Sequence, residues 1–194
     1  MRPLYRFLVG PLLAILFLLS TGCERPGLDY PFVSLDELAE REGWEPLTLE
    51  ELFSEVFVAV LREPEEVELN RIEIRDVYHE ELERSIPTVE RLIGPIAARP
   101  EDIEALVTHF TTMQNYGVGL GCPFEPEILI RFKKGPHQLD MLVNFSCAEV
   151  RLTVQGATIH SRELSVSPDT FRLLGRLAET YFPQDPYFRG LSEL

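Results

Sequence analysis

Two alternating apolar segments on either side of a turn constrain the fold of this chain more than any other feature. Apolar side chains occupy every second position in 128–132 and again in 139–145. This period of two is typical of β-strands with one buried face. The intervening segment KKGPH (133–137) combines glycine and proline with charged residues, as turns do. The sequence therefore predicts an antiparallel hairpin.

The predicted hairpin also brings two cysteines together. If the turn is centred on residues 134–135, Ile130 faces Leu139. The same register places Cys122 opposite Cys147, and directly opposed residues have Cα atoms about 4.5 to 5.5 Å apart, which a disulfide accepts. A redox couple is the alternative, but the two cysteines are far apart in sequence and lack the C-x-x-C spacing. We therefore predict a structural disulfide.

Helical and strand patterns flank this hairpin on both sides. Capping signals and apolar residues three and four positions apart predict helices, and runs of β-branched residues predict strands. The end of the second helical segment, VFVAVL, also suits a buried strand, and the Gly-Pro pair at 94–95 suits an edge strand. The predicted helices are 35–41, 49–62, one beginning at Pro100 and one beginning after Ser167, and the further strands are 67–74, 91–98, 149–155 and 158–164.

This order of elements predicts an α+β fold. Strands joined by short turns form mainly antiparallel sheets, and amphipathic helices bury their apolar stripe against such a sheet. We expect a sheet of about five or six strands with helices packed on one side. The glycine-rich segment GVGLG (117–121) is expected to be a loop, because it follows a helix and leads into a cysteine-proline turn.

A set of short motifs is spread over residues 67–182. They are VELNRI (67–72), LIGP (92–95), CPFEP (122–126), IRF (130–132), Asp140 and NFSC (144–147). The set resembles a family of small bacterial proteins, many of them secreted or lipidated. The resemblance implies a fold and no activity. Asn144 stands where the family often has cysteine and Leu129 where it often has histidine, so a metal or redox role built on those two residues does not carry over.

The amino terminus has the order of a secretory signal peptide. Arg2 and Arg6 form a basic start, and no charged residue follows in 7–22. The apolar stretch 7–19 is 13 residues long and contains a proline. Because a membrane-spanning helix needs roughly 20 apolar residues, a permanent transmembrane anchor is the weaker interpretation.

The end of this segment, LSTGC (19–23), resembles the lipobox of bacterial lipoproteins. The resemblance implies cleavage before Cys23 and a lipid on that cysteine, although Ser20 stands where the box usually has leucine. An ordinary cleaved signal peptide that leaves a cysteine near the new terminus is the alternative. The lipoprotein interpretation divides the chain into a signal peptide (1–22), the lipidated cysteine with a tether (23–33) and a single α+β domain (34–194).

The charge of the chain restricts its partners. The formal net charge is −14, and it is two units more negative without residues 1–22, which contain two arginines and no acidic residue. Nucleic acid and anionic lipid headgroups would be repelled by such a domain. We expect a membrane attachment through the lipid anchor, a partner that is an envelope protein or a cell-wall component, and no nucleic-acid partner.

Residue types that often carry chemistry are scattered. No two of the four histidines have a zinc-site spacing, and the acidic runs EEVE, HEELE and EPE lack the alternating oxygen ligands of an EF-hand. Packed or solvated histidines and solvated acidic faces are therefore expected, in preference to a zinc or calcium site. The sequence predicts no cofactor, metal site or catalytic residue. The histidines are His79, His109, His137 and His160.

Arg131 and Asp140 are the candidate binding-surface residues. In the predicted hairpin both point away from the face that carries the isoleucines and phenylalanines. Two interpretations remain open: they form an ion pair across the strands, or they line a binding surface.

These observations predict a non-enzymatic lipoprotein of the cell envelope that acts as a binding or scaffold module. Its position would be extracytoplasmic, on the outer membrane if the cell is Gram-negative. The alternative is a small hydrolase or a thiol or redox enzyme whose site is assembled from scattered residues. A deep pocket that gathers His137 or His160 with carboxylates would favour the enzyme, and separated histidines on a shallow surface would favour binding.

Overall fold

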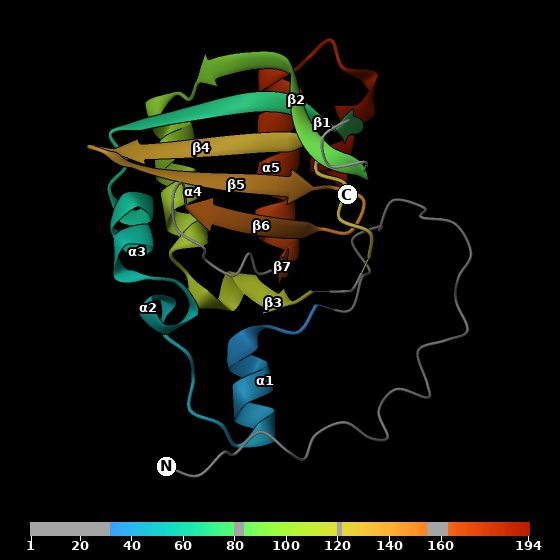
Figure 1. Cartoon of the computed structure of the whole chain (residues 1–194). Helices are drawn as coiled ribbons and strands as arrows, with labels where there is room; N and C mark the ends of the chain where they lie inside the picture. The colour runs from blue at the N-terminus through green and yellow to red at the C-terminus, as the bar shows by residue number, and fades with distance from the viewer. Residues whose placement is uncertain (1–31, 80–83, 120–121, 155–162) are drawn as a thin grey trace, which may run out of the picture.

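The computed structural model describes residues 32–79, 84–119, 122–154 and 163–194. Within them lies one seven-stranded sheet in the order β2-β1-β4-β5-β6-β7-β3 (Figure 1). The strands are β1 (Glu66–His79), β2 (Arg84–Ala97), β3 (Tyr116–Val118), β4 (Ile128–Lys134), β5 (His137–Asn144), β6 (Glu149–Val154) and β7 (Glu163–Val166). The helices are α1 (Leu35–Glu42), α2 (Leu49–Leu52), α3 (Glu55–Arg62), α4 (Pro100–Phe110) and α5 (Pro168–Tyr181), with short 3₁₀ turns at Met113–Asn115, Pro186–Phe188 and Leu191–Glu193.

The predicted α+β class is confirmed. Every pairing in the sheet is antiparallel, and the helices pack on one side of it, with α4 and α5 lying behind the sheet in Figure 1. The core between them is a single apolar cluster. Its fully buried side chains include Phe57 and Leu61 of α3, Phe132 of β4, Met141 of β5 and Leu177 of α5.

The helices begin where the capping signals predicted. The Ser34 side chain accepts a hydrogen bond from the Glu37 amide, and the Glu37 carboxylate accepts one from the Ser34 amide, which forms a capping box at α1. Pro100 occupies the first turn of α4, and the Ser167 side chain caps α5. Each of these three helices therefore matches its prediction.

The prediction of a single helix at 49–62 is wrong in one respect. The chain breaks at Phe53 and continues as two helices, because the Ser54 side chain accepts a hydrogen bond from the Phe57 amide (3.4 Å) and starts a new helix there. The break also lets the Phe53 ring stack on Phe57, with ring centroids 4.4 Å apart. The segment VFVAVL is helical, so its alternative interpretation as a strand is wrong.

The sheet has one strand more than expected, because β3 overlaps the segment 117–121 that was predicted to be a loop. Residues Tyr116–Val118 pair with β7. A Cβ atom on Gly117 would lie 2.5 Å from the Ser165 Oγ, so only glycine allows this close approach. A three-residue strand containing a glycine is too short for an alternating pattern to indicate it.

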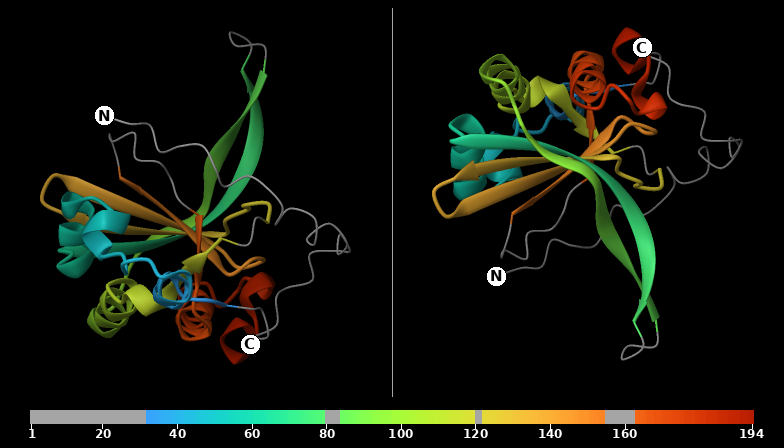
Figure 2. Two further views of the ribbon diagram at one scale, coloured as in Figure 1. Left: turned by 90° about the horizontal axis from the view of Figure 1, so that it is seen from below. Right: turned by 90° about the horizontal axis from the view of Figure 1, so that it is seen from above.

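Strands β1 and β2 are longer than the predicted 67–74 and 91–98. They extend beyond the rest of the sheet as a twisted two-stranded arm (Figure 2). Strand β2 is an edge strand, as the Gly-Pro pair predicted. The pairing is interrupted near Leu69 and Arg71, opposite Gly94, whose φ is 111° and whose Cβ would lie 2.8 Å from the Leu69 carbonyl oxygen.

The β4–β5 hairpin exists, but its predicted register is wrong by two residues. Lys134 pairs with His137, so the turn consists of Gly135 and Pro136, and Ile130 faces Met141 instead of Leu139. Gly135 has a φ of 53°, which suits the first position of a two-residue hairpin turn. A shift of two residues keeps every side chain on its predicted face, so the apolar pattern could not distinguish the two registers.

The predicted disulfide between Cys122 and Cys147 is confirmed, although not by the predicted pairing. Both cysteines lie outside the β4–β5 ladder, whose outermost pair is Ile128 and Val143. Their Cα atoms are 6.2 Å apart. The bond therefore links the segment just before β4 to the segment just after β5, at the end of the hairpin opposite its turn.

Among the residues that the structure describes, no helix has the length and apolarity required to cross a bilayer.

Candidate functional site

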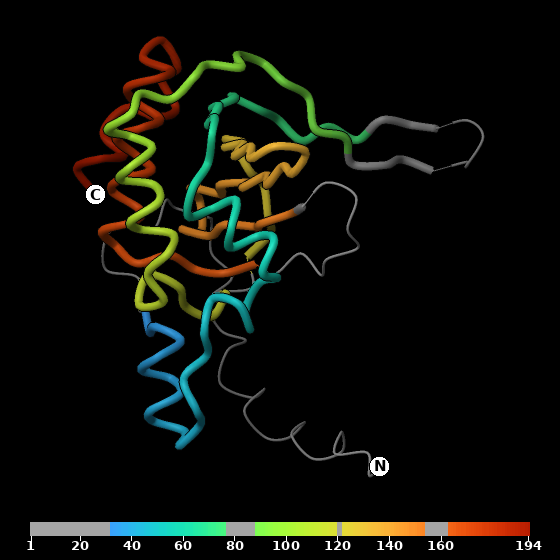
Figure 3. Tube along the Cα trace, turned by 90° about the vertical axis from the view of Figure 1, so that its left-hand side faces the viewer, coloured from blue at the N-terminus to red at the C-terminus, as the bar shows by residue number. Residues whose placement is uncertain are grey.

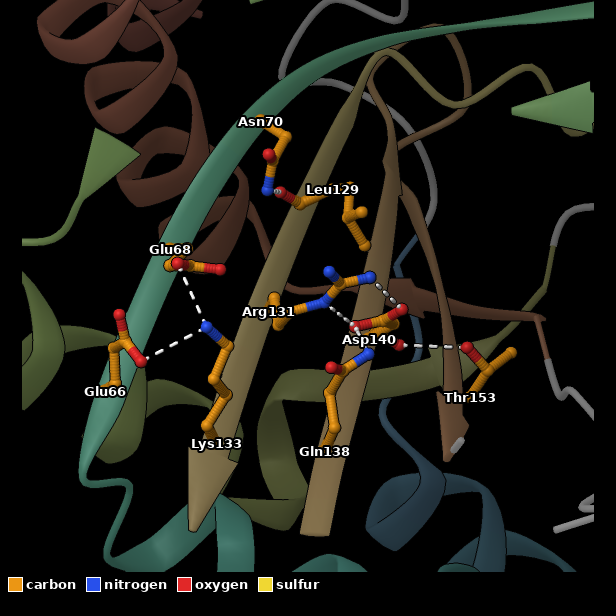
Figure 4. A network of polar contacts seen from close by, with 9 residues as sticks. All are labelled: Glu66, Glu68, Asn70, Leu129, Arg131, Lys133, Gln138, Asp140 and Thr153. Carbon is orange, nitrogen blue, oxygen red and sulfur yellow. Dashed lines mark hydrogen bonds and ion pairs between the residues drawn. The ribbon is translucent and has the colours of Figure 1, made fainter. Parts of the chain in front are cut away.

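The sheet face opposite the helices carries the candidate site. Alternate residues of β4 point in opposite directions, so Ile128, Ile130 and Phe132 enter the core while Arg131 and Lys133 reach the other face. Strands β1, β5 and β6 contribute to the same face, which is called the open face below (Figure 4). Its residues in Figure 4 are Glu66, Glu68, Asn70, Leu129, Arg131, Lys133, Gln138, Asp140 and Thr153.

An ion pair between Arg131 and Asp140 lies at the centre of the open face. The two residues are directly opposed on β4 and β5. Arg131 Nε lies 2.8 Å from Asp140 Oδ1 and Nη2 lies 2.9 Å from Oδ2, so the contact is bidentate. The hydrogen bonds to Asp140 raise the pKa of Arg131. Gln138 Nε2 donates to Asp140 Oδ1 at 3.1 Å and fixes the carboxylate further.

The structure decides in part between the two interpretations of this pair. Of its two open interpretations, the structure shows the ion pair across strands. In the predicted register Arg131 would have faced Gln138, so the two-residue shift is what places it opposite Asp140. The side chains are 22% and 23% exposed, so the pair is accessible from the open face but largely shielded from water. An ion pair with this accessibility can still be part of a binding surface.

Lys133 forms a second ion cluster beside this pair. Its Nζ lies 3.1 Å from Glu66 Oε2 and 3.0 Å from Glu68 Oε1, both on the neighbouring strand β1. Hydrogen bonds to Glu68 and Glu66 raise the pKa of Lys133. The cluster joins β1 to β4. Both cations that β4 places on this face, Arg131 and Lys133, therefore have a carboxylate partner among the described residues.

A hollow of about 390 Å³ opens between the arm and the ion pair. This volume lies within the usual range for small-ligand sites, roughly 300 to 1,000 Å³. Apolar side chains form much of its wall, and Arg91 of β2 stands at its rim without an ion pair to any described residue. The hollow thus combines apolar contact area with one bidentate ion pair and one additional cation. Its lining residues are Ile72, Val89, Arg91, Leu129, Arg131, Asp140, Leu142 and Thr153.

The histidines occupy separate parts of the fold. His109 on α4 contacts the Thr170 hydroxyl through Nδ1 at 3.0 Å, and burial lowers its pKa. His137 is exposed at the start of β5, and His79 ends β1. The fourth, His160, lies outside the described residues, as does the predicted turn at 155–156. Among the residues that the structure describes, no three histidine, cysteine, aspartate or glutamate side chains are grouped for metal binding.

The acidic run EPE (125–127) was expected to be a solvated face, but for Glu127 this is wrong, because its partly buried carboxylate holds the carboxyl-terminal segment against the sheet. Glu127 accepts a hydrogen bond from the Phe145 amide at 2.9 Å and another from the Tyr187 hydroxyl. Arg71 donates to the Glu127 carbonyl oxygen at 3.0 Å and pairs with Asp185 at 2.7 Å. These contacts join residues distant in sequence, so no local pattern could have revealed them.

The burial of Glu127 predicts a pH-dependent contribution to stability. Burial raises the pKa of Glu127 above its ordinary value of 4.5, although the hydrogen bonds from Tyr187 and the Phe145 amide oppose this shift. Between 4.5 and the raised pKa, the folded chain binds more protons than the unfolded chain, so the free energy of unfolding rises as the pH falls. Glu127→Gln removes this titration.

We expect the free energy of unfolding of the unsubstituted chain, measured relative to that of Glu127→Gln, to increase between neutral pH and about pH 4, near the ordinary pKa of glutamate. Urea unfolding of both chains across this pH interval measures the difference between their free energies of unfolding. The contributions of the other titrating groups are common to both chains and cancel in this difference. A difference that decreases with falling pH would contradict the raised pKa.

Comparison with known proteins provides no relative for this chain. No family model matches the sequence, and neither the curated proteins nor the solved structures include a significant match.

Proposed function

We propose that this chain is a bacterial lipoprotein whose α+β domain is a non-enzymatic binding or scaffold module of the cell envelope. Cleavage before Cys23 and lipid attachment to it would hold the domain at the extracytoplasmic side of a membrane, the outer membrane in a Gram-negative cell. The basic start, the short apolar stretch and the LSTGC segment support the anchor. The Cys122–Cys147 disulfide supports it independently, because disulfides persist in oxidising compartments outside the cytoplasm.

The observation that carries the binding role is the hollow on the open face. Its walls are strands of one sheet, so the side chains that line it are held by a rigid scaffold. The Arg131–Asp140 pair gives the surface a fixed polarity, and the apolar side chains around it supply contact area. A partner from the envelope, either a protein or a cell-wall component, would be recognised by both features.

Two observations favour binding over the enzymatic alternative. Cys122 and Cys147 are bonded to each other, so neither offers a free thiol to a thiol or redox mechanism. His109 and His137 lie on different elements, and neither lines the hollow on the open face. His109 does contact a hydroxyl, that of Thr170, but the Thr170 side chain is fully buried, so a substrate could not reach this pair as a hydrolase would require.

Exchanging the two charges tests the binding role. In the double variant Arg131→Asp with Asp140→Arg, the ion pair can form again across the same strands, so the free energy of unfolding should change much less than in either single variant. The polarity presented to a partner is reversed, and binding should be lost. The readout is photo-cross-linking in cells from a benzophenone amino acid placed at Arg91, on the rim of the hollow.

The matched control carries the same benzophenone amino acid at Glu104, an exposed residue of α4. We expect a discrete cross-linked product from position 91, its loss in the charge-exchanged variant and no such product from position 104. Equal cross-linking from both positions, or a product from position 91 that survives the exchange, would show that the open face is not the binding surface.

A further inference from the structure

Helix α1 and the segment that follows it stand out from the body of the molecule (Figures 1 and 3). The helix ends at Glu42. The φ of 70° at Gly43 turns the chain back, and the Trp44 amide closes this turn by donating to the Ala39 carbonyl oxygen at 2.8 Å. All residues of 43–48 are exposed before the chain enters the core again at Leu49. This projecting segment, 43–48, is called the tip.

The tip exposes large apolar side chains. Trp44, the only tryptophan of the chain, is 58% exposed, and Leu47 is 42% exposed. Trp44 and Pro46 line a hollow of about 660 Å³ together with Phe32. A contiguous exposed apolar patch marks an interaction surface, and the tip gathers Trp44, Pro46 and Leu47 within four residues.

The position of Phe32 indicates which surface meets the tip. Phe32 is the first residue that the structure describes, and it lies nine residues after Cys23. Because an extended chain spans at most about 3.3 to 3.6 Å per residue, a lipid on Cys23 holds Phe32 within roughly 30 Å of the bilayer surface. Phe32 and Trp44 line the same hollow from the two ends of α1, about 12 Å apart at 1.5 Å per helical residue, so the tether lets the tip reach the bilayer.

We propose that the tip rests on the bilayer that carries the lipid anchor, with Trp44 and Leu47 in the headgroup region. This inference depends on the anchor in the proposed function and adds a second contact that limits the rotation of the domain. Tryptophan suits this depth, because its ring is apolar and its indole N–H can hydrogen-bond to headgroups.

The charge around the tip determines which lipids it can meet. Helix α1 and the tip carry five acidic residues and one arginine, and a negative lipid surface would repel them. We therefore assign the contact to zwitterionic headgroups. The charged residues are Asp36, Glu37, Glu40, Arg41, Glu42 and Glu45.

The single tryptophan makes the contact measurable. The mature lipidated protein is reconstituted into phosphatidylcholine vesicles, with and without bromine atoms on the acyl chains just below the headgroups. We expect the Trp44 emission to shift to shorter wavelength on vesicle binding and to lose most of its intensity in the brominated vesicles. The matched control is Trp44→Phe with Leu92→Trp, which moves the tryptophan to β2, where Leu92 is 44% exposed. Its emission should not be quenched.

Equal quenching of the two proteins, or no quenching of Trp44 in protein that is bound to the vesicles, would overturn the tip contact. The mass of Cys23 in the same preparation separates this outcome from failure of the proposed function. A chain without an acyl group on Cys23 would reject the anchor, whereas an acylated, vesicle-bound chain with an unquenched Trp44 would reject only the tip contact.

Discussion

Replacing Cys23 with alanine is expected to stop both lipid attachment and cleavage, so that cells accumulate a chain that keeps residues 1–22 and carries no acyl group. The reason is that the proposed processing makes Cys23 both the acceptor of the lipid and the first residue of the mature chain. Gel mobility and incorporation of labelled palmitate measure the two effects. The change should be all or none.

The matched control for this experiment is Cys122→Ala with Cys147→Ala, which removes the other two cysteines of the chain. This variant should be cleaved and labelled like the unsubstituted chain. If Cys23→Ala is cleaved at the normal position and the palmitate label persists, the lipoprotein assignment is wrong.

The same double variant, Cys122→Ala with Cys147→Ala, is expected to lower the free energy of unfolding by about 3 kcal/mol. The disulfide closes a loop with a sequence separation of 25 residues and so reduces the conformational entropy of the unfolded chain. In the chain-entropy estimate, removing the bond restores that entropy and stabilises the unfolded state. Because small domains are stable by only about 5 to 15 kcal/mol, this is a large fraction of the total. Alanine is the appropriate replacement, since Cys147 is buried and a serine hydroxyl would need a hydrogen-bond partner there.

Urea unfolding of the oxidised chain, the reduced chain and the double variant measures this contribution. The reduced chain and the double variant should unfold at similarly low urea concentrations, well below the midpoint of the oxidised chain. Three coincident midpoints would mean that Cys122 and Cys147 are not bonded in the protein.

Local signals in the sequence were sufficient for the class of the fold and for most helix starts. The capping box of Ser34 and Glu37, the proline at the start of α4 and the Ser167 cap each act within one helical turn, so they can be recognised without knowledge of the rest of the chain. The alternation in β4 and β5 likewise depends only on which face is buried.

Features that depend on distant contacts could not be predicted in the same way. The register of the β4–β5 hairpin is an example, because registers two residues apart bury the same side chains and only the turn at Gly135 and Pro136 distinguishes them. The Gly117 strand forms through its approach to Ser165. Neither contact produces a periodic pattern in the sequence.

In the candidate site too, local features were predicted and contacts between distant residues were not. The sequence indicated that Arg131 and Asp140 share the face opposite the core, but it could not decide whether they meet. Their bidentate contact follows from the register, and the hollow beside them requires β2, on which Val89 and Arg91 lie. The Glu127 contacts with Phe145 and Tyr187 were missed entirely, because they join segments brought together only by folding.

The mass of the amino-terminal peptide of the mature protein, purified from membranes, tests the proposed lipoprotein most directly. We expect a peptide that begins at Cys23 and carries a diacylglyceryl group on the cysteine sulfur, with or without a further acyl chain on its amino group. A mature chain that begins at any other residue, or that begins at an unmodified Cys23, would contradict the lipoprotein assignment.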